Sequence, residues 1–213
     1  MTPPTLLWLR RDLRLADNPA LAAAIERSGP VIPVFVLDPL IEGFGAAPLW
    51  RLGESLGAFA EALEDAGSRL ILRRGDALEA LAALAAETGA GAVVWSRLYD
   101  GPAIARDTAV KAGLRERGLA ADSVNGSLLF EPWTVQTGSG GFYKVYTPFW
   151  KAVRDRDPGA PLPAPSAIPA PEAWPASDAL ADWRLGARMH RGAAVVARHA
   201  RIGGAAGAAR PDA

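Results

Sequence analysis

Cysteine is absent from this 213-residue chain, and histidine is nearly absent, since only His190 and His199 occur. The lack of cysteine excludes disulfide bonds, thiolate catalysis and cysteine-ligated zinc. The two histidines lie close together in an arginine-rich segment near the end of the sequence. We therefore expect no metal site in this protein.

A surplus of either charge is also absent, because Lys+Arg and Asp+Glu each number 23. Proteins that bind nucleic acid over a broad surface usually carry excess positive charge, which concentrates phosphate groups around them. We therefore expect any affinity of this chain for DNA to be local and small.

Long apolar runs are missing as well. No stretch reaches the roughly 18 uncharged apolar residues of a membrane-spanning helix. The first ten residues, MTPPTLLWLR, lack the basic start and apolar stretch of a secretory signal. With 50% hydrophobic and 22% charged residues, the composition is that of a globular domain with one core. We expect a cytoplasmic protein.

Short apolar runs alternate with segments of helical periodicity along the first 124 residues. The runs that predict buried strands are Leu6–Leu9, Val31–Leu37, Arg69–Leu72, Ala92–Trp95 and Leu119–Val124. The segments that predict helices are Pro19–Arg27, Leu49–Ala66, Leu78–Thr88 and Pro102–Arg117. Continuous apolar strands alternating with helices are typical of parallel sheets covered on both faces. The prediction is an α/β fold with a Rossmann-like, doubly wound, mainly parallel five-stranded sheet and helices on both faces.

Two residues make this pattern more specific. Asn18 can cap the helix that begins at Pro19, because its side chain can accept a hydrogen bond from a free N–H of the first turn. Pro33 falls inside the best strand pattern but has no N–H to donate. We therefore predict an edge position or a bulge for that part of the strand.

The second half of the chain predicts the end of one domain, a linker and the beginning of another region. Residues 125–150 lose periodicity and contain the sequence GSGG, which predicts a loop-rich segment. Seven prolines between Pro158 and Pro175 predict an extended linker. Beyond them, Trp183–Arg201 predicts an arginine-rich helix, and Gly203–Ala213 is an Ala/Gly-rich end. The predicted units are an α/β domain (1–156), a proline-rich linker (157–180) and the start of a helical region (181–213).

Two motifs stand out. Residues 8–21 read WLRRDLRLADNPAL, and residues 142–152 read FYKVYTPFWKA. The motif positions are Trp8, Arg10, Arg11, Asp12, Arg14, Asp17 and Asn18 in the first, and Lys144, Tyr146, Thr147, Pro148 and Phe149 in the second. With the Arg106-Asp107 pair, the GSLL sequence at 126–129 and the proline-rich linker, they make most of residues 5–201 resemble the N-terminal α/β domain of the DNA photolyase and cryptochrome family.

The resemblance implies a complete protein that uses light and reduced FAD to reverse pyrimidine dimers in damaged DNA, the deoxyribodipyrimidine photolyase reaction. In cryptochromes the same flavin serves light signalling. In this family both chemistries belong to a C-terminal helical domain, whose TSRLS-like and WREF-like motifs have no counterpart in these 213 residues. We therefore expect a chain that stops before the FAD site, has no catalytic residue and does not repair DNA alone.

The resemblance also implies that the N-terminal domain holds an antenna chromophore, either a folate or a deazaflavin. Asp38 and Arg51 stand at positions that resemble the crevice of deazaflavin-type photolyases, and a carboxylate with a guanidinium could fix a polar ring edge. Tyr99 and Asp100 follow the fourth strand, where they could stack on a ring and hydrogen-bond to it. Structural roles are the competing interpretation: a turn aspartate, a charge at a helix end and, for Asp100, a helix cap.

Folate-binding relatives carry an Asn-Glu pair where this chain has Pro102-Ala103. The resemblance therefore favours a deazaflavin, or no antenna, over a folate. For the motif at 8–21, a phosphate or chromophore contact at the end of a strand competes with a salt-bridged strand-to-helix turn, which we favour. For the motif at 142–152, packing between domains is favoured over stacking on nucleotides.

Two alternative functions remain open from the sequence. One is a stand-alone chromophore- or nucleotide-binding module that serves a separate flavoprotein. The other is a fragment of a cryptochrome-type photoreceptor.

Overall fold

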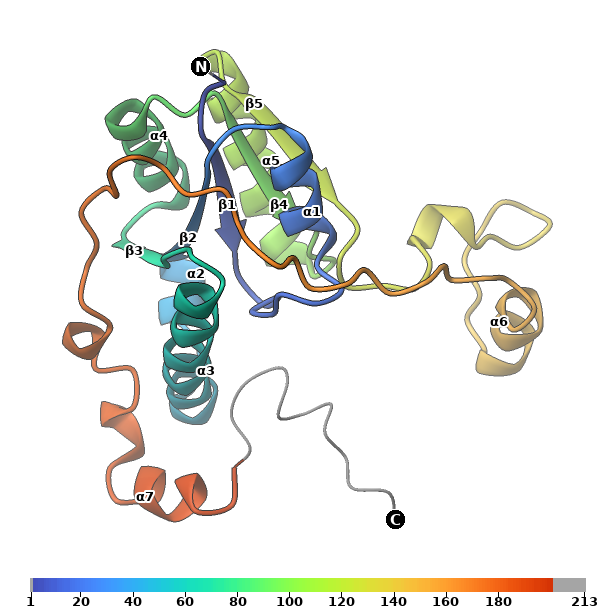
Figure 1. The fold of residues 1–213 in the computed structure, drawn as a ribbon. Coiled ribbons are helices and arrows are strands. Elements are labelled where there is room, and N and C mark those ends of the chain that lie inside the picture. Colours follow the sequence, from blue (N-terminus) through green and yellow to red (C-terminus); the bar gives the residue numbers. More distant parts are fainter. Residues whose placement is uncertain (1, 201–213) are drawn as a thin grey trace.

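The computed structural model describes residues 2–200. The five strands are β1 (Thr5–Leu9), β2 (Val31–Leu37), β3 (Ile71–Arg74), β4 (Ala92–Ser96) and β5 (Ala120–Val124). They form one sheet in the order β3-β2-β1-β4-β5, and every neighbouring pair is parallel (Figure 1). The predicted five-stranded parallel sheet is confirmed.

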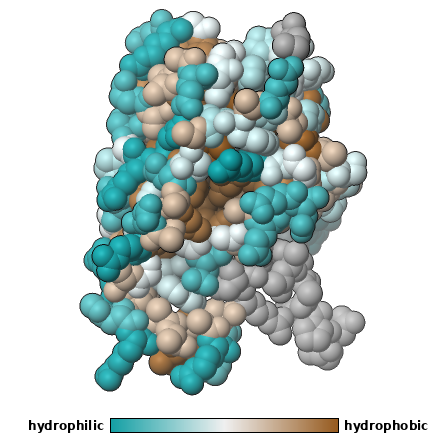
Figure 2. Space-filling model, turned by 60° about the vertical axis from the view of Figure 1, so that its left-hand side comes forward, coloured by the Kyte–Doolittle hydropathy of each residue, from teal (hydrophilic) through white to brown (hydrophobic). Residues whose placement is uncertain are grey.

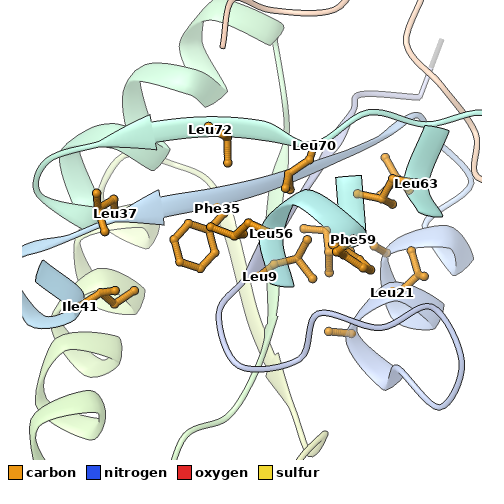
Figure 3. Packing of buried hydrophobic residues seen from close by; sticks show 14 of the residues in the cluster. Leu9, Leu21, Phe35, Leu37, Ile41, Leu56, Phe59, Leu63, Leu70 and Leu72 are labelled. Atoms are coloured by element: carbon orange, nitrogen blue, oxygen red, sulfur yellow. The ribbon is translucent and has the colours of Figure 1, made fainter. Parts of the chain in front are cut away.

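Helices cover both faces of the sheet. They are α1 (Pro19–Glu26), α3 (Ala46–Asp65), α4 (Ala77–Thr88) and α5 (Gly101–Glu116). Leu7 and Leu9 of β1 pack with α1 and α3, whereas Leu6 and Trp8 pack with α4 and α5. This alternation follows from the two-residue period of a strand, which points successive side chains to opposite faces. Figure 3 shows the first of these two cores. The doubly wound arrangement is confirmed.

The strand order creates a switch point between β1 and β4. The chain runs outward from β1 through β2 to β3 and then crosses to β4 on the other side of β1. The connections that leave β1 and β4 therefore go in opposite directions. In open α/β sheets a crevice forms at this place, outside the carboxyl ends of the strands.

Pro33 occupies a part of β2 that has one strand neighbour only. Its pairing is with Leu7 of β1, and the pairing of β2 with β3 begins one residue later, at Val34. The N–H of Val31 donates to the carbonyl of Pro169 at 2.8 Å, on the side of β2 that faces away from β1. Pro33 is two residues further along the strand, so its nitrogen points to the same side. Pro33 thus faces the β3 side just ahead of the ladder, where its missing N–H removes no strand-to-strand bond. The predicted edge position holds for this part of an otherwise interior strand.

Two helices were not predicted. The short helix α2 (Pro39–Glu42) directly follows β2. The helix α6 (Tyr146–Val153) lies within and just beyond the segment predicted to be loop-rich. Pro148 is the third residue of α6, in the first turn, where N–H groups have no partner inside the helix and proline is tolerated.

The predicted helix over Trp183–Arg201 is wrong for the residues that the structure describes. The segment forms two 3₁₀ turns, Leu180–Trp183 and Ala187–Met189, and the short helix α7 (Gly192–Ala197). Trp183 and Leu185 are both buried in the core. A spacing of two does not put both side chains on one face of a helix, and left-handed backbone at Arg184 and His190 interrupts the segment. Residues 201–213, including the Ala/Gly-rich end, lie outside the described part.

The proline-rich segment 158–178, which we call the strap, is extended as predicted and packs along the α/β domain (Figure 1). Ile168 is only 3% exposed and belongs to the same core as Leu56 and Phe59 of α3. The carbonyl of Pro169 accepts the N–H of Val31. The strap therefore covers part of the domain core.

No helix within residues 2–200 is both long and apolar enough to cross a membrane. In that same range, no three His, Asp or Glu side chains gather in a group that could hold a metal ion. On the face shown in Figure 2 the surface is hollowed, with hydrophobic residues at the bottom of the hollow and mostly hydrophilic residues around it.

We expect Ile168→Ala to lower the free energy of unfolding by about 2–4 kcal/mol, because it deletes a buried side chain from the core. The matched control is Leu162→Ala in the same segment, where the side chain is 39% exposed and the expected loss is below about 1 kcal/mol. Urea unfolding followed by circular dichroism measures both values. A loss for Ile168→Ala no larger than that of the control would mean that the strap is a linker only.

Candidate functional site

Two arginines lie over the indole of Trp8, near the carboxyl end of β1. The guanidinium carbon of Arg10 is 4.1 Å from the ring centroid, and that of Arg106, from α5, is 4.9 Å away. Trp8 is fully buried and contacts the edge of Trp95 on β4 at 5.5 Å between centroids. The negative face of an indole attracts a cation, more strongly when water is excluded. The stack thereby links the ends of β1 and β4 to α5.

Two carboxylates neutralise this pair of cations. Asp38 Oδ2 accepts a hydrogen bond from Arg106 Nη1 at 2.8 Å. Asp107 contacts both guanidinium groups, Arg106 at 2.8 Å and Arg10 at 3.3 Å. Burial lowers the pKa of Arg10 to about 10, and the charge of Asp107 opposes this change. In the sequence, Arg106 was noted only as half of the Arg106-Asp107 pair that supports the family resemblance, and it was not predicted to belong to a site. Its place in the first turns of the helix after β4 was the signal that could have identified it.

Asp38 was predicted to contact a chromophore, but its carboxylate is occupied by other protein groups. Its Oδ1 accepts the N–H of Ile41 at 3.0 Å and caps α2, while its other oxygen holds Arg106. The side chain is 2% exposed. Asp38 therefore holds Arg106 in position and does not face open space.

A pocket of about 450 Å³ opens beside this stack, and we call it the arginine pocket. Its polar side chains are four arginines and one serine: Arg10, Arg11, Arg51, Arg106 and Ser55. Its other walls are apolar side chains: Leu13, Phe35, Leu40, Ile41, Phe44, Pro48, Leu52 and Leu98. No carboxylate of the described residues lines it. A pocket with apolar walls and several cationic groups suits a flat ring system with an electron-rich or anionic edge.

A second pocket of about 940 Å³ lies against the strap, and we call it the strap pocket. It shares Arg11 and Leu98 with the arginine pocket. Its remaining walls come from the first motif, the loop after β4, residues 125–129 and residues 158–162 of the strap. Tyr99 and Asp100, two of the predicted contacts, line this pocket, whereas Arg51 lines the other. The structure thus divides the predicted contacts between two neighbouring pockets.

Asp100 has the capping role that was the competing interpretation. It accepts the N–H of Ala103 at 3.3 Å at the start of α5, and it pairs with Arg11 at 2.8 Å. Burial acts to raise the pKa of Asp100, but the hydrogen bond from Ala103 and the charge of Arg11 outweigh it and hold this pKa below its ordinary value. Asp100 therefore remains ionised beside Arg11.

Tyr99 is tied to the loop that follows β5. Its hydroxyl contacts Glu131 at 2.8 Å and Asn125 at 3.2 Å. Burial, with help from Glu131, raises the pKa of Tyr99 to about 12. The phenol thus stays protonated and can donate a hydrogen bond.

The first motif folds the loop between β1 and α1. Asn18 caps α1 as predicted, accepting the N–H of Leu21 at 3.1 Å. Its amide also donates to the carbonyls of Asp12 and Arg14. The carboxylate of Asp12 accepts the main-chain N–H of Arg10, while Arg10 and Arg11 form ion pairs with carboxylates of α5 and of the loop before it.

The second motif lies outside the walls of both pockets. Tyr146 is 70% exposed, and its ring stacks on Trp150 with 6.4 Å between centroids. Lys144, Thr147 and Phe149 come from the same segment, which stands apart from the sheet with α6 (Figure 1). This surface and the two pockets are separate features of the protein.

We expect Tyr99 to ionise near pH 12 and not near pH 10. Because the pKa is higher in the folded state than in the unfolded state, this group contributes stability that is complete below pH 10 and is lost as the pH rises through 12. The measurement is an ultraviolet titration of tyrosinate in the wild type minus that in Tyr99→Phe. A difference signal with its midpoint at the ordinary tyrosine value would refute the effect of burial and Glu131.

Asp38→Ala is expected to destabilise the protein by about 2–4 kcal/mol, because it removes a helix cap and a charge-assisted hydrogen bond to Arg106. Asp76→Ala is the matched control, since Asp76 caps α4 by an exposed hydrogen bond and its loss is expected to cost about 1 kcal/mol. Chemical denaturation gives both numbers. Equal losses would show that Asp38 acts as a cap alone.

Comparison with known proteins identifies the family. The family model for DNA photolyase matches residues 5–169. A deoxyribodipyrimidine photo-lyase of Agrobacterium fabrum is 49% identical over 185 residues, which cover 86% of this chain and 39% of that protein. Cryptochrome-2 of Arabidopsis thaliana is 39% identical over 73% of this chain and 26% of its own length.

A solved structure shows the same arrangement. The class III photolyase from Agrobacterium tumefaciens superposes with a TM-score of 0.83 and 48% identity, covering 87% of this chain and 39% of the solved chain. The protein described here thus corresponds to about two fifths of these photolyases. From the family match and the shared fold, we conclude that the chain belongs to the DNA photolyase family.

Proposed function

We propose that this chain is the antenna-binding α/β domain of a deoxyribodipyrimidine photolyase, and that the arginine pocket holds a chromophore of the deazaflavin type. The complete photolyase would use reduced FAD, excited directly or through the antenna, to reverse pyrimidine dimers in damaged DNA. Membership of the DNA photolyase family supports the first part of this proposal, the photolyase domain. The arginine pocket supports the second part, the binding of an antenna chromophore.

The observation that carries the proposal is the composition of the arginine pocket. Its volume of about 450 Å³ lies in the range of small-molecule sites. Phe35, Ile41 and Phe44 can cover the faces of a fused ring, while the guanidinium group of Arg51 can donate to its oxygen atoms. Arg51 has no carboxylate partner within residues 2–200, so its donors are available to a ligand at the mouth of the pocket.

The start of α5 supports a deazaflavin over a folate. The pair expected to bind a pterin is replaced by Pro102 and Ala103, in the first turn of the helix. Proline has no N–H, and neither side chain can hydrogen-bond. Ala103 is also fully buried. The polar groups that a pterin needs are thus missing at this position, whereas the arginine pocket offers donors to the carbonyl and hydroxyl groups of a deazaflavin.

FAD supplies the electron for dimer reversal in photolyases. The flavin and lesion motifs of the family have no match in these 213 residues, so we assign no step of repair to a side chain of this chain. With equal numbers of positive and negative residues, we expect the chain alone to bind DNA weakly.

The test is titration with 8-hydroxy-5-deazariboflavin, followed by its fluorescence and visible absorption. We expect saturable binding by the wild type and roughly tenfold weaker binding by Arg51→Gln, because the variant loses a charge-assisted hydrogen bond. The control is Arg69→Gln, an exposed arginine outside both pockets, which should bind like the wild type.

The folate 5,10-methenyltetrahydrofolate serves as the competing ligand. Tighter binding of the folate than of the deazaflavin would overturn the deazaflavin assignment. Absence of binding by either compound would overturn the antenna role altogether. Co-purification of a separate flavoprotein with a chromophore-loaded chain would favour a stand-alone antenna module.

A further inference from the structure

We propose that the packing of Arg10 and Arg106 on Trp8 protects an excited ring in the arginine pocket from taking an electron from that indole. This inference rests on the proposed function, and it concerns the fate of absorbed light and not the place where the ring binds. An antenna passes on its excitation energy only if its excited state survives. Electron transfer from a tryptophan ends that state, because the electron that the indole loses enters the ring and then returns, which releases the energy as heat.

The walls of the arginine pocket contain no side chain that gives up an electron readily. Its aromatic residues are Phe35 and Phe44, and no Trp, Tyr, Met or His of the described residues lines it. Tyr99 lines the strap pocket instead. Trp8 lies behind the wall, because the two arginines that cover its ring line the pocket. The ring in the pocket is therefore separated from this indole by cations.

The two guanidinium groups make the loss of an electron from Trp8 unfavourable. Their carbons lie 4.1 Å and 4.9 Å from the centroid of the indole, and Trp8 is fully buried. Positive charges over the ring attract its electrons and oppose the formation of an indole radical cation, with little water to screen them. Asp38 and Asp107 bind the guanidinium groups and hold them in place. Burial lowers the pKa of Arg10 only to about 10, so this cation persists at neutral pH.

The N–H groups of two buried indoles provide a second, independent observation. Oxidation of an indole becomes easier when its N–H can pass a proton to a base. The Nε1 atom of Trp8 has no hydrogen-bond acceptor within residues 2–200, and neither has that of Trp95, whose ring contacts Trp8. Buried polar groups normally have a partner. Here the missing acceptors leave no base to take the proton, which keeps both indoles difficult to oxidise.

The test compares the fluorescence lifetime of 8-hydroxy-5-deazariboflavin bound at saturation to the wild type and to variants of the stack. In Arg106→Gln the amide can still donate to Asp38, but a positive charge is lost from the face of Trp8. We expect the lifetime to shorten by roughly tenfold, because the indole becomes easier to oxidise. The absorption of an indole radical cation should then follow a light pulse. Arg106→Lys keeps the charge and should keep a lifetime close to that of the wild type.

Three further variants serve as controls. Trp8→Phe in the Arg106→Gln background removes the electron donor and should return the lifetime to the wild-type value. Phe44→Trp, at a partly buried position, places an indole in the pocket wall without cationic cover and should shorten the lifetime at least as much as Arg106→Gln. It keeps the inference testable even where Arg106→Gln fails to fold. Arg69→Gln, at an exposed position outside both pockets, should leave the lifetime unchanged.

The outcomes separate this inference from the proposed function. A wild-type lifetime as short as that of Phe44→Trp, or an Arg106→Gln lifetime equal to that of the wild type, would overturn the inference and leave the ring site standing. Equal shortening in Arg106→Lys and Arg106→Gln would refute protection by charge. A lifetime that stays short after Trp8→Phe is added would exclude Trp8 as the donor. Failure of the compound to bind the wild type would overturn the proposed function and the inference together.

Discussion

The packing of Arg10 and Arg106 on the indole of Trp8 is the interaction on which the candidate site depends. The buried Arg10 and the half-buried Arg106 share one ring, where Asp38 and Asp107 neutralise them and the electron-rich face of the indole stabilises them. The four charged groups come from the residues that directly follow β1 and β2 and from α5. The stack therefore fixes the positions of three elements at the switch point of the sheet and supplies the cationic side of the arginine pocket.

The strap packs on the domain from the crevice, where residues 158–162 lie, to the amino end of β2. The carbonyl of Pro169 accepts the N–H of Val31, the first residue of β2, and the buried Ile168 extends one of the two cores. Nearer its beginning, it closes the strap pocket against Asp17. A segment whose composition suggests a passive linker thus contributes both to the stability of the α/β domain and to the shape of the candidate site.

These two features give the crevice an asymmetric chemistry. The arginine pocket has apolar walls and four arginines, and the strap pocket has a balanced mixture of donors, acceptors and charges. The exposed aromatic surface of α6 lies elsewhere and takes no part in this site.

The sequence by itself determined the α/β class, the five parallel strands, the cap at Asn18 and the membership of the family, because each depends on local periodicity, local capping chemistry or a contiguous motif. It also placed Arg51, Tyr99 and Asp100 near the carboxyl ends of the strands. Only the tertiary structure decided that Asp38 faces Arg106, that Trp183 and Leu185 enter the core from irregular turns, and that the strap packs on the domain. These facts rest on contacts between residues far apart in the chain, which no local pattern of residue types encodes.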